Sequence, residues 1–122
     1  MAFDLFKLDG KVAVVTGANT GLGQAMAVAL ATAGADVALV GRSAPTETEK
    51  MIGAAGRRFC TVTADLSTTE PVGRIVAETR EALGPPDILV NNAGIIRRAD
   101  ALDFSEDDWD DVLATNLKVP FF

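Results

Sequence analysis

Short apolar runs alternate along the chain with longer stretches in which apolar and polar residues mix. The short runs are rich in Val, Ile, Leu or Thr; they lie at residues 12–16, 36–40, 58–63 and 88–91. Apolar runs of this length are typical of strands buried on both faces of a parallel sheet. The mixed stretches predict helices at residues 22–33, 45–55 and from 65 or 67 to 83.

The order of these elements predicts the fold class. Strand, helix and strand follow one another within about thirty residues, the size of one βαβ unit. Because such connections are right-handed, the sequence predicts an α/β fold with a doubly wound parallel sheet, of which about four strands are present. We find no internal repeat or domain boundary, and we expect residues 43–50 to be the one mobile loop.

A further helix is expected to begin at Ser105, which is followed by three acidic residues. A serine N-cap and acids in the first turn both stabilise a helix start. Trp109, Val112, Leu113 and Asn116 then recur at helical spacing and share one face. We expect this face to be buried, and a buried Asn116 amide would need hydrogen-bond partners.

Composition and charge narrow the possible functions. An apolar fraction of 48% supports a core, whereas a net charge of −6 and a pI of about 4.5 argue against a nucleic-acid partner. The chain has no His and one cysteine, Cys60, which excludes an intrachain disulfide, a His/Cys metal site and a His-dependent catalytic triad. No apolar run approaches about 20 residues, and residues 1–11 are too short and charged for a signal peptide. We therefore expect a cytoplasmic protein without a membrane partner.

The strongest chemical signal is the glycine-rich stretch from Thr16 to Gly23, directly after the first strand and at the start of a helix. Gly17 permits a tight turn, Gly21 lets the backbone approach a pyrophosphate, and Gly23 lets helix and strand pack closely. The free N–H groups of the helix N-terminus favour a bound anion. A glycine-rich turn without a ligand is the alternative, but the strand–turn–helix context favours nucleotide binding.

Several motifs occur together in one order: Thr16-Gly-Ala-Asn-Thr-Gly-Leu-Gly23, Asp65-Leu66 after the third strand, Asn91-Asn-Ala-Gly94 after the fourth, and then Asn116. With these motifs the chain resembles the short-chain dehydrogenase/reductase family over essentially all of its 122 residues. The resemblance implies a Rossmann-like fold and a nicotinamide cofactor. The cofactor contacts that it implies are Gly17, Asn19, Thr20, Gly21, Leu22, Gly23, Arg42, Ser43, Asp65, Leu66, Asn92, Ala93 and Gly94.

Each motif also has a purely structural interpretation. Asn91 and Asn92 could cap the strand, although their amides could also bridge neighbouring strands, and Asp65 could cap a helix. Asn116 could be a hydrogen-bonded core amide, whereas the resemblance makes it a catalytic residue whose backbone carbonyl holds a water that connects to the catalytic lysine.

The family's proton transfer also needs a Ser and a Tyr-x-x-x-Lys segment, and this chain contains no Tyr. We therefore expect residues 1–122 to be the N-terminal dinucleotide-binding part of a single domain, truncated before that segment. A short product that only binds nucleotide is the alternative. Exposed apolar residues at 119–122 favour the first interpretation.

The end of the second strand bears on the choice of cofactor. NAD-preferring folds carry an acid here that contacts the ribose 2′-OH, whereas this chain has Gly41, Arg42 and Ser43. A missing acid beside an arginine suits a 2′-phosphate, so NADP is favoured, with NAD as the alternative. Arg42 could instead be a solvated charge, and Thr20, where many NADP-dependent members of the family carry a basic residue, counts against NADP.

The loop after the fourth strand carries Arg97 and Arg98, a plausible clamp for a substrate carboxylate. Solvated charges paired with the acids at 103–111 are the alternative. In residues 96–111, and in the stretches 19–24, 44–48 and 56–59, the chain resembles the family branch of 2-deoxy-D-gluconate 3-dehydrogenases and ketouronate reductases. That branch implies oxidation or reduction at a secondary alcohol or ketone of a sugar acid.

Two rival functions remain. A 3-ketoacyl reductase of the same family shares the frame, but its acyl-carrier partner would favour a basic patch and this chain is acidic. A protein that binds NAD(P) without turnover is the rival from another class. The resemblance further implies a homotetramer, with the helix that begins at Ser105 in an interface.

Overall fold

The computed structural model describes residues 2–122, so Met1, part of the expected 1–122 unit, lies outside the described residues. Strands β1 (Val12–Thr16), β2 (Asp36–Gly41), β3 (Phe59–Thr63) and β4 (Ile88–Val90) form one parallel sheet in the order β3-β2-β1-β4. The helical elements are η1 (Ala2–Phe6), α1 (Gly21–Thr32), α2 (Thr46–Ala54), α3 (Val72–Ala82), α4 (Glu106–Leu113), the π-helical turn η2 (Ala114–Lys118) and α5 (Val119–Phe121). The predicted parallel α/β sheet is confirmed.

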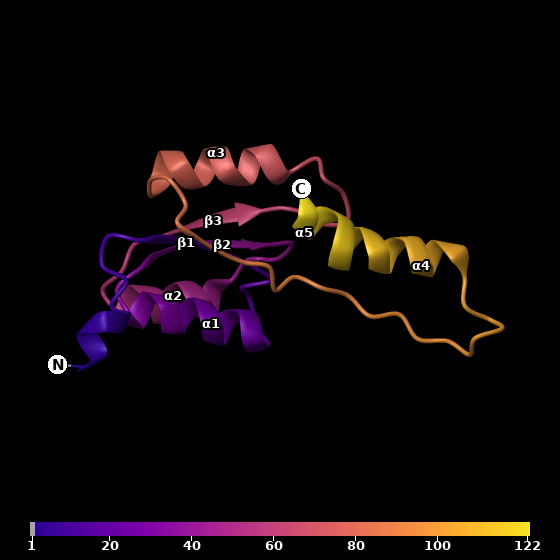
Figure 1. Cartoon of the computed structure of the whole chain (residues 1–122), viewed down its shortest axis with the longest axis horizontal. Coiled ribbons are helices and arrows are strands. Elements are labelled where there is room, and N and C mark those ends of the chain that lie inside the picture. Colours follow the sequence, from indigo (N-terminus) through magenta and orange to yellow (C-terminus); the bar gives the residue numbers. More distant parts are fainter. Residues whose placement is uncertain (1) are drawn as a thin grey trace.

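Helices cover both faces of this sheet. Figure 1 shows α1 and α2 on one face and α3 on the other, with α4 projecting beyond the end of the sheet. The strand β1 is buried along its whole length, as a strand covered on both faces must be. Its side chains alternate between the two layers, because Val14 packs on the α3 side and Val15 on the α1 side.

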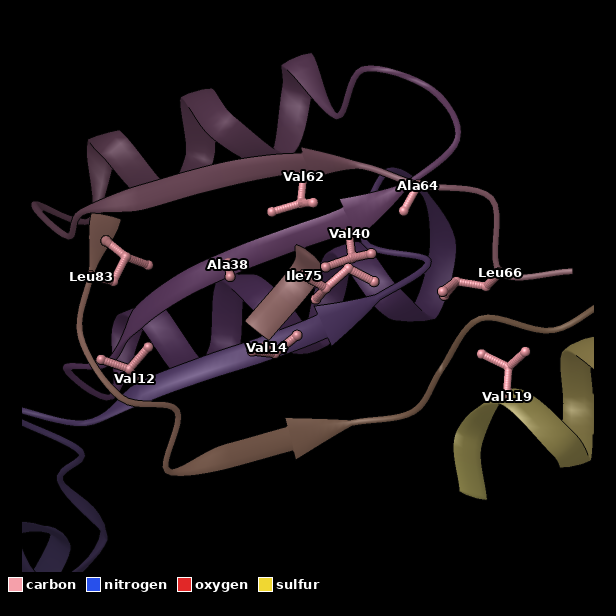
Figure 2. Close-up of a cluster of buried hydrophobic side chains, with 10 residues drawn as sticks. All are labelled: Val12, Val14, Ala38, Val40, Val62, Ala64, Leu66, Ile75, Leu83 and Val119. Atoms are coloured by element: carbon pink, nitrogen blue, oxygen red, sulfur yellow. The ribbon is translucent and has the colours of Figure 1, made fainter. Parts of the chain in front are cut away.

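The core on the α3 side collects residues from every strand except β4 and from both ends of the described chain. Figure 2 shows Val12 and Val14 from β1 in the same layer as Val62 from β3, with Ile75 of α3 between Val14 and Val40 in this view. Val119 of α5 joins this cluster at the carboxyl edge of the sheet, so the expected exposure of residues 119–122 is wrong at Val119, although Phe121 and Phe122 are exposed. The chain therefore returns to the sheet after the long loop that follows β4.

The strand order places a reversal between β1 and β4. The chain proceeds outward from β1 through β2 to β3, and then β4 pairs with the opposite edge of β1. In doubly wound sheets the loops on either side of such a reversal leave a crevice at the carboxyl ends of the strands. Any ligand site of this fold is expected there.

Two sequence-based expectations about element boundaries are wrong. Helix α3 begins at Val72 rather than at residue 65 or 67, because the Asp65 carboxylate accepts a hydrogen bond from the Ser67 N–H and closes a local turn instead. The stretch 43–50 is not simply a loop, since α2 begins at Thr46 and fully buries Thr48.

The expected burial of one face of α4 is also wrong. Trp109 is 59% exposed, Leu113 is 39% exposed, and Asn116 is exposed as well. The capping of this helix was predicted correctly, because the Ser105 hydroxyl accepts a hydrogen bond from the Asp108 N–H at 3.1 Å. The periodic spacing therefore identified the apolar stripe, but no segment within residues 2–122 covers it.

Candidate functional site

A pocket of about 430 Å³ opens at the carboxyl edge of the sheet. It is bounded by the loops that follow all four strands and by one side of α4 and η2. The residues that line it are Gly17, Asn19, Gly41, Arg42, Ser43, Ala64, Asp65, Leu66, Ser67, Ala93, Gly94, Ile95, Arg97, Asp111 and Thr115. Most residues singled out from the sequence thus meet in one pocket, of a size typical of small-molecule sites.

The remaining singled-out residues lie around this pocket without lining it. Thr20, Gly21 and Leu22 continue the chain from Asn19 into α1, and the side chain of Leu22 is 76% exposed. The others that do not line the pocket are Gly23, Asn92, Arg98 and Asn116. The contacts that each of these residues makes beside the pocket are described in turn below.

Each glycine of the turn is required for a different structural reason. Gly17 and Gly21 have positive φ angles of 64° and 56°, a region that favours glycine. A Cβ at Gly21 would meet no atom within 4 Å, so the backbone here is open to a ligand. A Cβ at Gly23 would overlap the carbonyl oxygen of Gly17, and only glycine allows the turn to lie so close to α1.

The N-terminus of α1 has no side-chain cap. Thr20 occupies the N-cap position, but its hydroxyl makes no capping hydrogen bond, and the first turn contains no acid. The first N–H groups of a helix have no partner within the helix. Together with the helix dipole they make this end of α1 suitable for an anion such as a phosphate.

Asn92 ties the two sides of the strand reversal together. Its side-chain amide donates to the carbonyl oxygens of Thr16 and Gly17, both at 3.1 Å. The Thr16 hydroxyl in turn accepts from the N–H groups of Asn92 at 3.0 Å and Ala93 at 2.9 Å. The expected bridge between strands is thus present. It explains why Asn92 supports the glycine turn from behind the pocket.

The end of β2 presents polar side chains to the pocket. Asn19 donates from its side-chain amide to the Ser43 hydroxyl at 2.7 Å, linking the glycine turn to the loop after β2. A Cβ at Gly41 would be 3.9 Å from Asn19 Oδ1, so this position has room for a side chain that the sequence lacks. Hydrogen bonds from the backbone and side chain of Ser67 lower the pKa of Asp65, and the charge of Arg42 lowers it further.

Asn116 lies within the π-helical turn, and its side chain is fully engaged. Its Oδ1 accepts from the Ile95 N–H and its Nδ2 donates to the Ile95 carbonyl, both at 2.9 Å. This two-point contact holds the loop just after Gly94 against η2. The backbone carbonyl of Asn116 is four residues before Pro120, which has no N–H and cannot donate the usual helical hydrogen bond.

The two arginines after β4 differ in their surroundings. Arg97 lines the pocket and forms ion pairs with Asp108 at 3.4 Å and Asp111 at 3.7 Å. Arg98 does not line this pocket, and within residues 2–122 it forms no ion pair. The two ion pairs of Arg97 are partly exposed to solvent and therefore contribute little stability. The structure separates the proposed pair, since Arg97 alone lies at the pocket.

Sequence reasoning missed several residues of this site. Gln24, Thr48 and Thr115 were not identified, and Asp111 was named only among the acids at 103–111 that could pair with the arginines, a pairing that Arg97 makes with Asp108 and Asp111. Helical spacing alone could have shown that Thr48 shares a face with the buried Ile52, four residues later. Gln24 interrupts the apolar surface of α1, which marks a polar residue with a hydrogen-bonding role. Asp111 and Thr115 depend on how α4 docks, which no local pattern shows.

Other kinds of site find no support in the described chain. Across residues 2–122 no cluster of three His, Cys, Asp or Glu side chains could hold a metal ion. None of the helices in this part of the chain is long and apolar enough to cross a membrane.

A parallel sheet with a strand reversal and a glycine turn at its carboxyl edge defines a Rossmann-like α/β protein. A family model described as short chain dehydrogenase matches residues 11–122. The chain therefore belongs to the short chain dehydrogenase family, which confirms the family expected from its motifs.

Individual relatives agree with this assignment. The chain is 52% identical over 122 residues to 2-dehydro-3-deoxy-D-gluconate 5-dehydrogenase of Escherichia coli (strain K12), covering 100% of this chain and 48% of that protein. A crystal structure of a provisionally named 2-deoxy-D-gluconate 3-dehydrogenase from Agrobacterium tumefaciens, with bound NADP, matches with a TM-score of 0.81 and 50% identity over 96% of this chain and 46% of that one. A short chain dehydrogenase from Mycobacterium paratuberculosis bound to NAD matches with a TM-score of 0.88 and 31% identity, over 94% and 48% of the two chains. The chain thus spans about half the length of the proteins that it matches.

Proposed function

We propose that this chain is the cofactor-binding half of an NAD(P)-dependent oxidoreductase that acts on a secondary alcohol or ketone of a sugar acid. The observation that carries the proposal is the pocket at the strand reversal, where an uncapped helix N-terminus meets polar groups from every strand end. The cofactor, when bound, supplies or accepts the hydride. The names of the similar proteins, which include a 2-dehydro-3-deoxy-D-gluconate 5-dehydrogenase, support a sugar acid as substrate.

The residues in and around the pocket have separate tasks in this proposal. The N–H groups of Thr20, Gly21 and Leu22 bind the pyrophosphate at the positive end of α1. Gly17 and Gly23 shape the turn, with Asn92 holding it from behind. Asp65 and Leu66 contact the adenine, and the backbone of Ala93 and Gly94 lies beside the cofactor ribose.

NADP is the proposed cofactor, with NAD as the alternative. Arg42 is a cation beside the position where NAD-preferring folds carry an acid, and Ser43 and Asn19 provide further polar groups. A guanidinium can hold a ribose 2′-phosphate through two hydrogen bonds. The similar protein crystallised with NADP is 50% identical to this chain and the one with NAD is 31% identical, which supports naming NADP first.

The chemistry beyond cofactor binding is assigned to Asn116, Arg97 and a segment after residue 122. The Asn116 side chain is occupied by Ile95, while its backbone carbonyl has a proline at the position of its helical donor. That carbonyl is therefore available to hold a water in the proton path, which supports a catalytic role for Asn116. Of the two arginines after β4, Arg97 is the one at the pocket and would attract the substrate carboxylate.

The wider properties of the protein belong to the same proposal. We infer that residues 1–122 are the N-terminal part of a single domain, and that the Ser and Tyr-x-x-x-Lys residues lie in the part that follows. The length of the relatives, about twice that of this chain, supports this division. We further infer a homotetramer in the cytoplasm. The exposed apolar stripe of α4 around Trp109 and Leu113 supports an interface there.

Gly21→Asp tests the cofactor assignment, with Gly21→Asn as its matched control. Both side chains tolerate a positive φ angle and both project into open space, so they differ chiefly in charge. A negative charge against the pyrophosphate should weaken NADPH binding about 100-fold relative to the Asn variant. Isothermal titration calorimetry on the intact protein measures this difference, and equal affinities of the two variants would disprove the assignment.

A further inference from the structure

A buried hydrogen-bonded chain links α2 to the glycine turn. The Thr48 hydroxyl, which is fully buried, donates to the Ala18 carbonyl at 2.8 Å. The same hydroxyl accepts from the Gln24 side-chain amide at 3.1 Å, and this amide also reaches the Asn19 carbonyl at 3.4 Å. Two successive carbonyl groups of the turn are thus held by side chains from α1 and α2.

The orientation of these carbonyl groups fixes the orientation of the N–H groups beside them. In a trans peptide the C=O and N–H groups point in opposite directions. Because the carbonyls of Ala18 and Asn19 point toward Gln24 and Thr48, the N–H groups of Asn19 and Thr20 point away from α2. Within residues 2–122 neither N–H group has an acceptor.

The chain of hydrogen bonds continues to the loop after β2. The Asn19 side chain donates to the Ser43 hydroxyl at 2.7 Å, and both residues line the pocket. Ser43 follows Arg42 and precedes α2, which carries Thr48. The glycine turn is thus hydrogen-bonded both to Thr48 within α2 and to Ser43 in the loop that leads into α2.

We propose that Thr48 and Gln24 are positioning residues that set the affinity of the site for the adenosine 2′-phosphate half of the cofactor. They touch no part of the pocket themselves. They hold the Ala18–Asn19–Thr20 backbone with its N–H groups outward, and through Asn19 they fix Ser43 beside Arg42. The inference rests on the proposed function, because it says which residues hold in place the groups that would bind the 2′-phosphate.

Removal of the Thr48 hydroxyl should change the orientation of the peptide group between Ala18 and Asn19. Thr48→Val keeps the shape of the side chain but leaves the Ala18 carbonyl without a donor in a site where Ala18 is 1% exposed. An unsatisfied buried carbonyl favours rotation of its peptide group toward other donors. That rotation would turn the Asn19 N–H inward and displace the side chain that holds Ser43.

Thr79 provides a matched control on the other face of the sheet. Its side chain is also fully buried, and its hydroxyl donates to the Ile75 carbonyl at 2.7 Å within α3. Thr79→Val therefore removes a buried hydroxyl and its hydrogen bond at a place remote from the pocket, without touching the glycine turn. Thr48→Ser is the conservative variant that restores the hydroxyl.

The test measures dissociation constants of three probes by calorimetry on the intact protein: NADPH, adenosine 2′,5′-bisphosphate and nicotinamide mononucleotide. Thr48→Val should raise the constants of the first two about tenfold and leave that of nicotinamide mononucleotide unchanged. Thr48→Ser should restore wild-type values, and Thr79→Val should lower the melting temperature without changing any constant.

Several results would overturn the inference. Unchanged affinities in a folded Thr48→Val protein would do so, as would an equal loss in Thr79→Val or a failure of Thr48→Ser to restore binding. If Thr48→Val does not fold, Gln24→Met replaces it, since it removes the amide while Thr48 still donates to Ala18. A wild-type protein that binds none of the probes would instead disprove the proposed function itself.

Discussion

At the scale of single residues, Arg42 and Ser43 form the polar end of the pocket where β2 terminates. The neighbouring position, Gly41, leaves space beside Asn19 that an acidic side chain would occupy in an NAD-preferring fold. The hydrogen bonds from Ser67 are the main cause of the lowered pKa of Asp65, and the positive charge of Arg42 adds to it. A phosphate at this place would find a cation already present.

Arg42→Ala should therefore weaken NADPH binding about tenfold or more, because a charge-assisted contact to the 2′-phosphate is lost. NADH binding should change by less than about twofold, since NADH carries no phosphate there. The ratio of the two dissociation constants is the quantity to measure. Arg80→Ala, which removes an exposed arginine of α3, is the control, and an equal loss for both cofactors would refute the 2′-phosphate assignment.

Arg97 and Arg98 lead to a second prediction at this scale. Arg97 lines the pocket and its ion pairs with two aspartates are long and partly exposed, so its guanidinium can be drawn to a substrate carboxylate. In the intact enzyme, Arg97→Ala should raise KM for a sugar acid about tenfold more than for the neutral sugar. Arg98→Ala should change both constants equally; the same discrimination from both variants would contradict the structural distinction between them.

At the scale of elements, the starts of β2 and β3 are joined by a cluster around Asp36. Its carboxylate accepts hydrogen bonds from Arg57 at 2.8 Å and from the side chain and backbone of Arg58. Burial raises the pKa of Asp36, but the hydrogen bonds and charges of the two arginines lower it more, so the pKa lies below its usual value. The cluster thus fixes the register of both strands at the end opposite the pocket.

Asp36→Asn should lower the free energy of unfolding by about 1–3 kcal/mol at pH 7, because the charged pairs are lost. A lowered pKa means that the stabilisation is present above about pH 4, the range of an unfolded Asp, and disappears as the pH falls through the folded value. Urea denaturation between pH 7 and pH 2 should show the two proteins converging in acid. Glu78→Gln, an exposed partner of Arg74, is the control and should change stability by less than about 0.5 kcal/mol; a pH-independent difference would exclude the ionic explanation.

Much of the element order could be predicted from the sequence, and the failures have physical causes. Strands such as Val12–Thr16 were predicted because β-branched runs are visible locally. The start of α3 was misplaced because Asp65 satisfies a nearby backbone N–H and delays the helix. The π-helical turn was not predicted, since its extra residue follows from how η2 docks and not from a local pattern.

In the candidate site, too, some residues could be predicted from local sequence and others could not. The glycine turn and Asn92 carry strong local signatures because steric limits and strand-end geometry demand those residues. The contact of Asn116 with Ile95 and the burial of Thr48 join segments that are distant in sequence. Such contacts depend on packing, which residue patterns do not specify.

At the scale of the whole molecule, the two faces of the sheet are unequally covered. Two helices, α1 and α2, cover one face and α3 covers the other (Figure 1), where an apolar groove of about 180 Å³ lies beside β4. Leu89 of β4 is 60% exposed and Phe122 is 69% exposed at this groove. Apolar surface of this kind marks a place that further protein covers.

The natural protein should accordingly have a mass near twice the 12.7 kDa of this chain, as mass spectrometry of the purified protein would show. Residues 1–122 expressed alone should bind a hydrophobic dye such as anilinonaphthalene sulfonate, and the longer protein should bind much less, because added chain covers the groove. A natural product of 12.7 kDa that binds no dye would show that the groove needs no further chain.

The π-helical turn has one more consequence, which concerns helical phase. A π-helical turn holds one residue more than an α-helical turn and takes it up as a local bulge, so the helix on either side keeps its phase. Thr115 and Val119, four residues apart, are both buried, while Asn116 in the same turn meets Ile95. Deleting a single residue from 114–118 should therefore restore a regular helix and remove the placement of Asn116 against Ile95. The extra residue of this turn is what brings the segment after β4 and the end of the described chain into register.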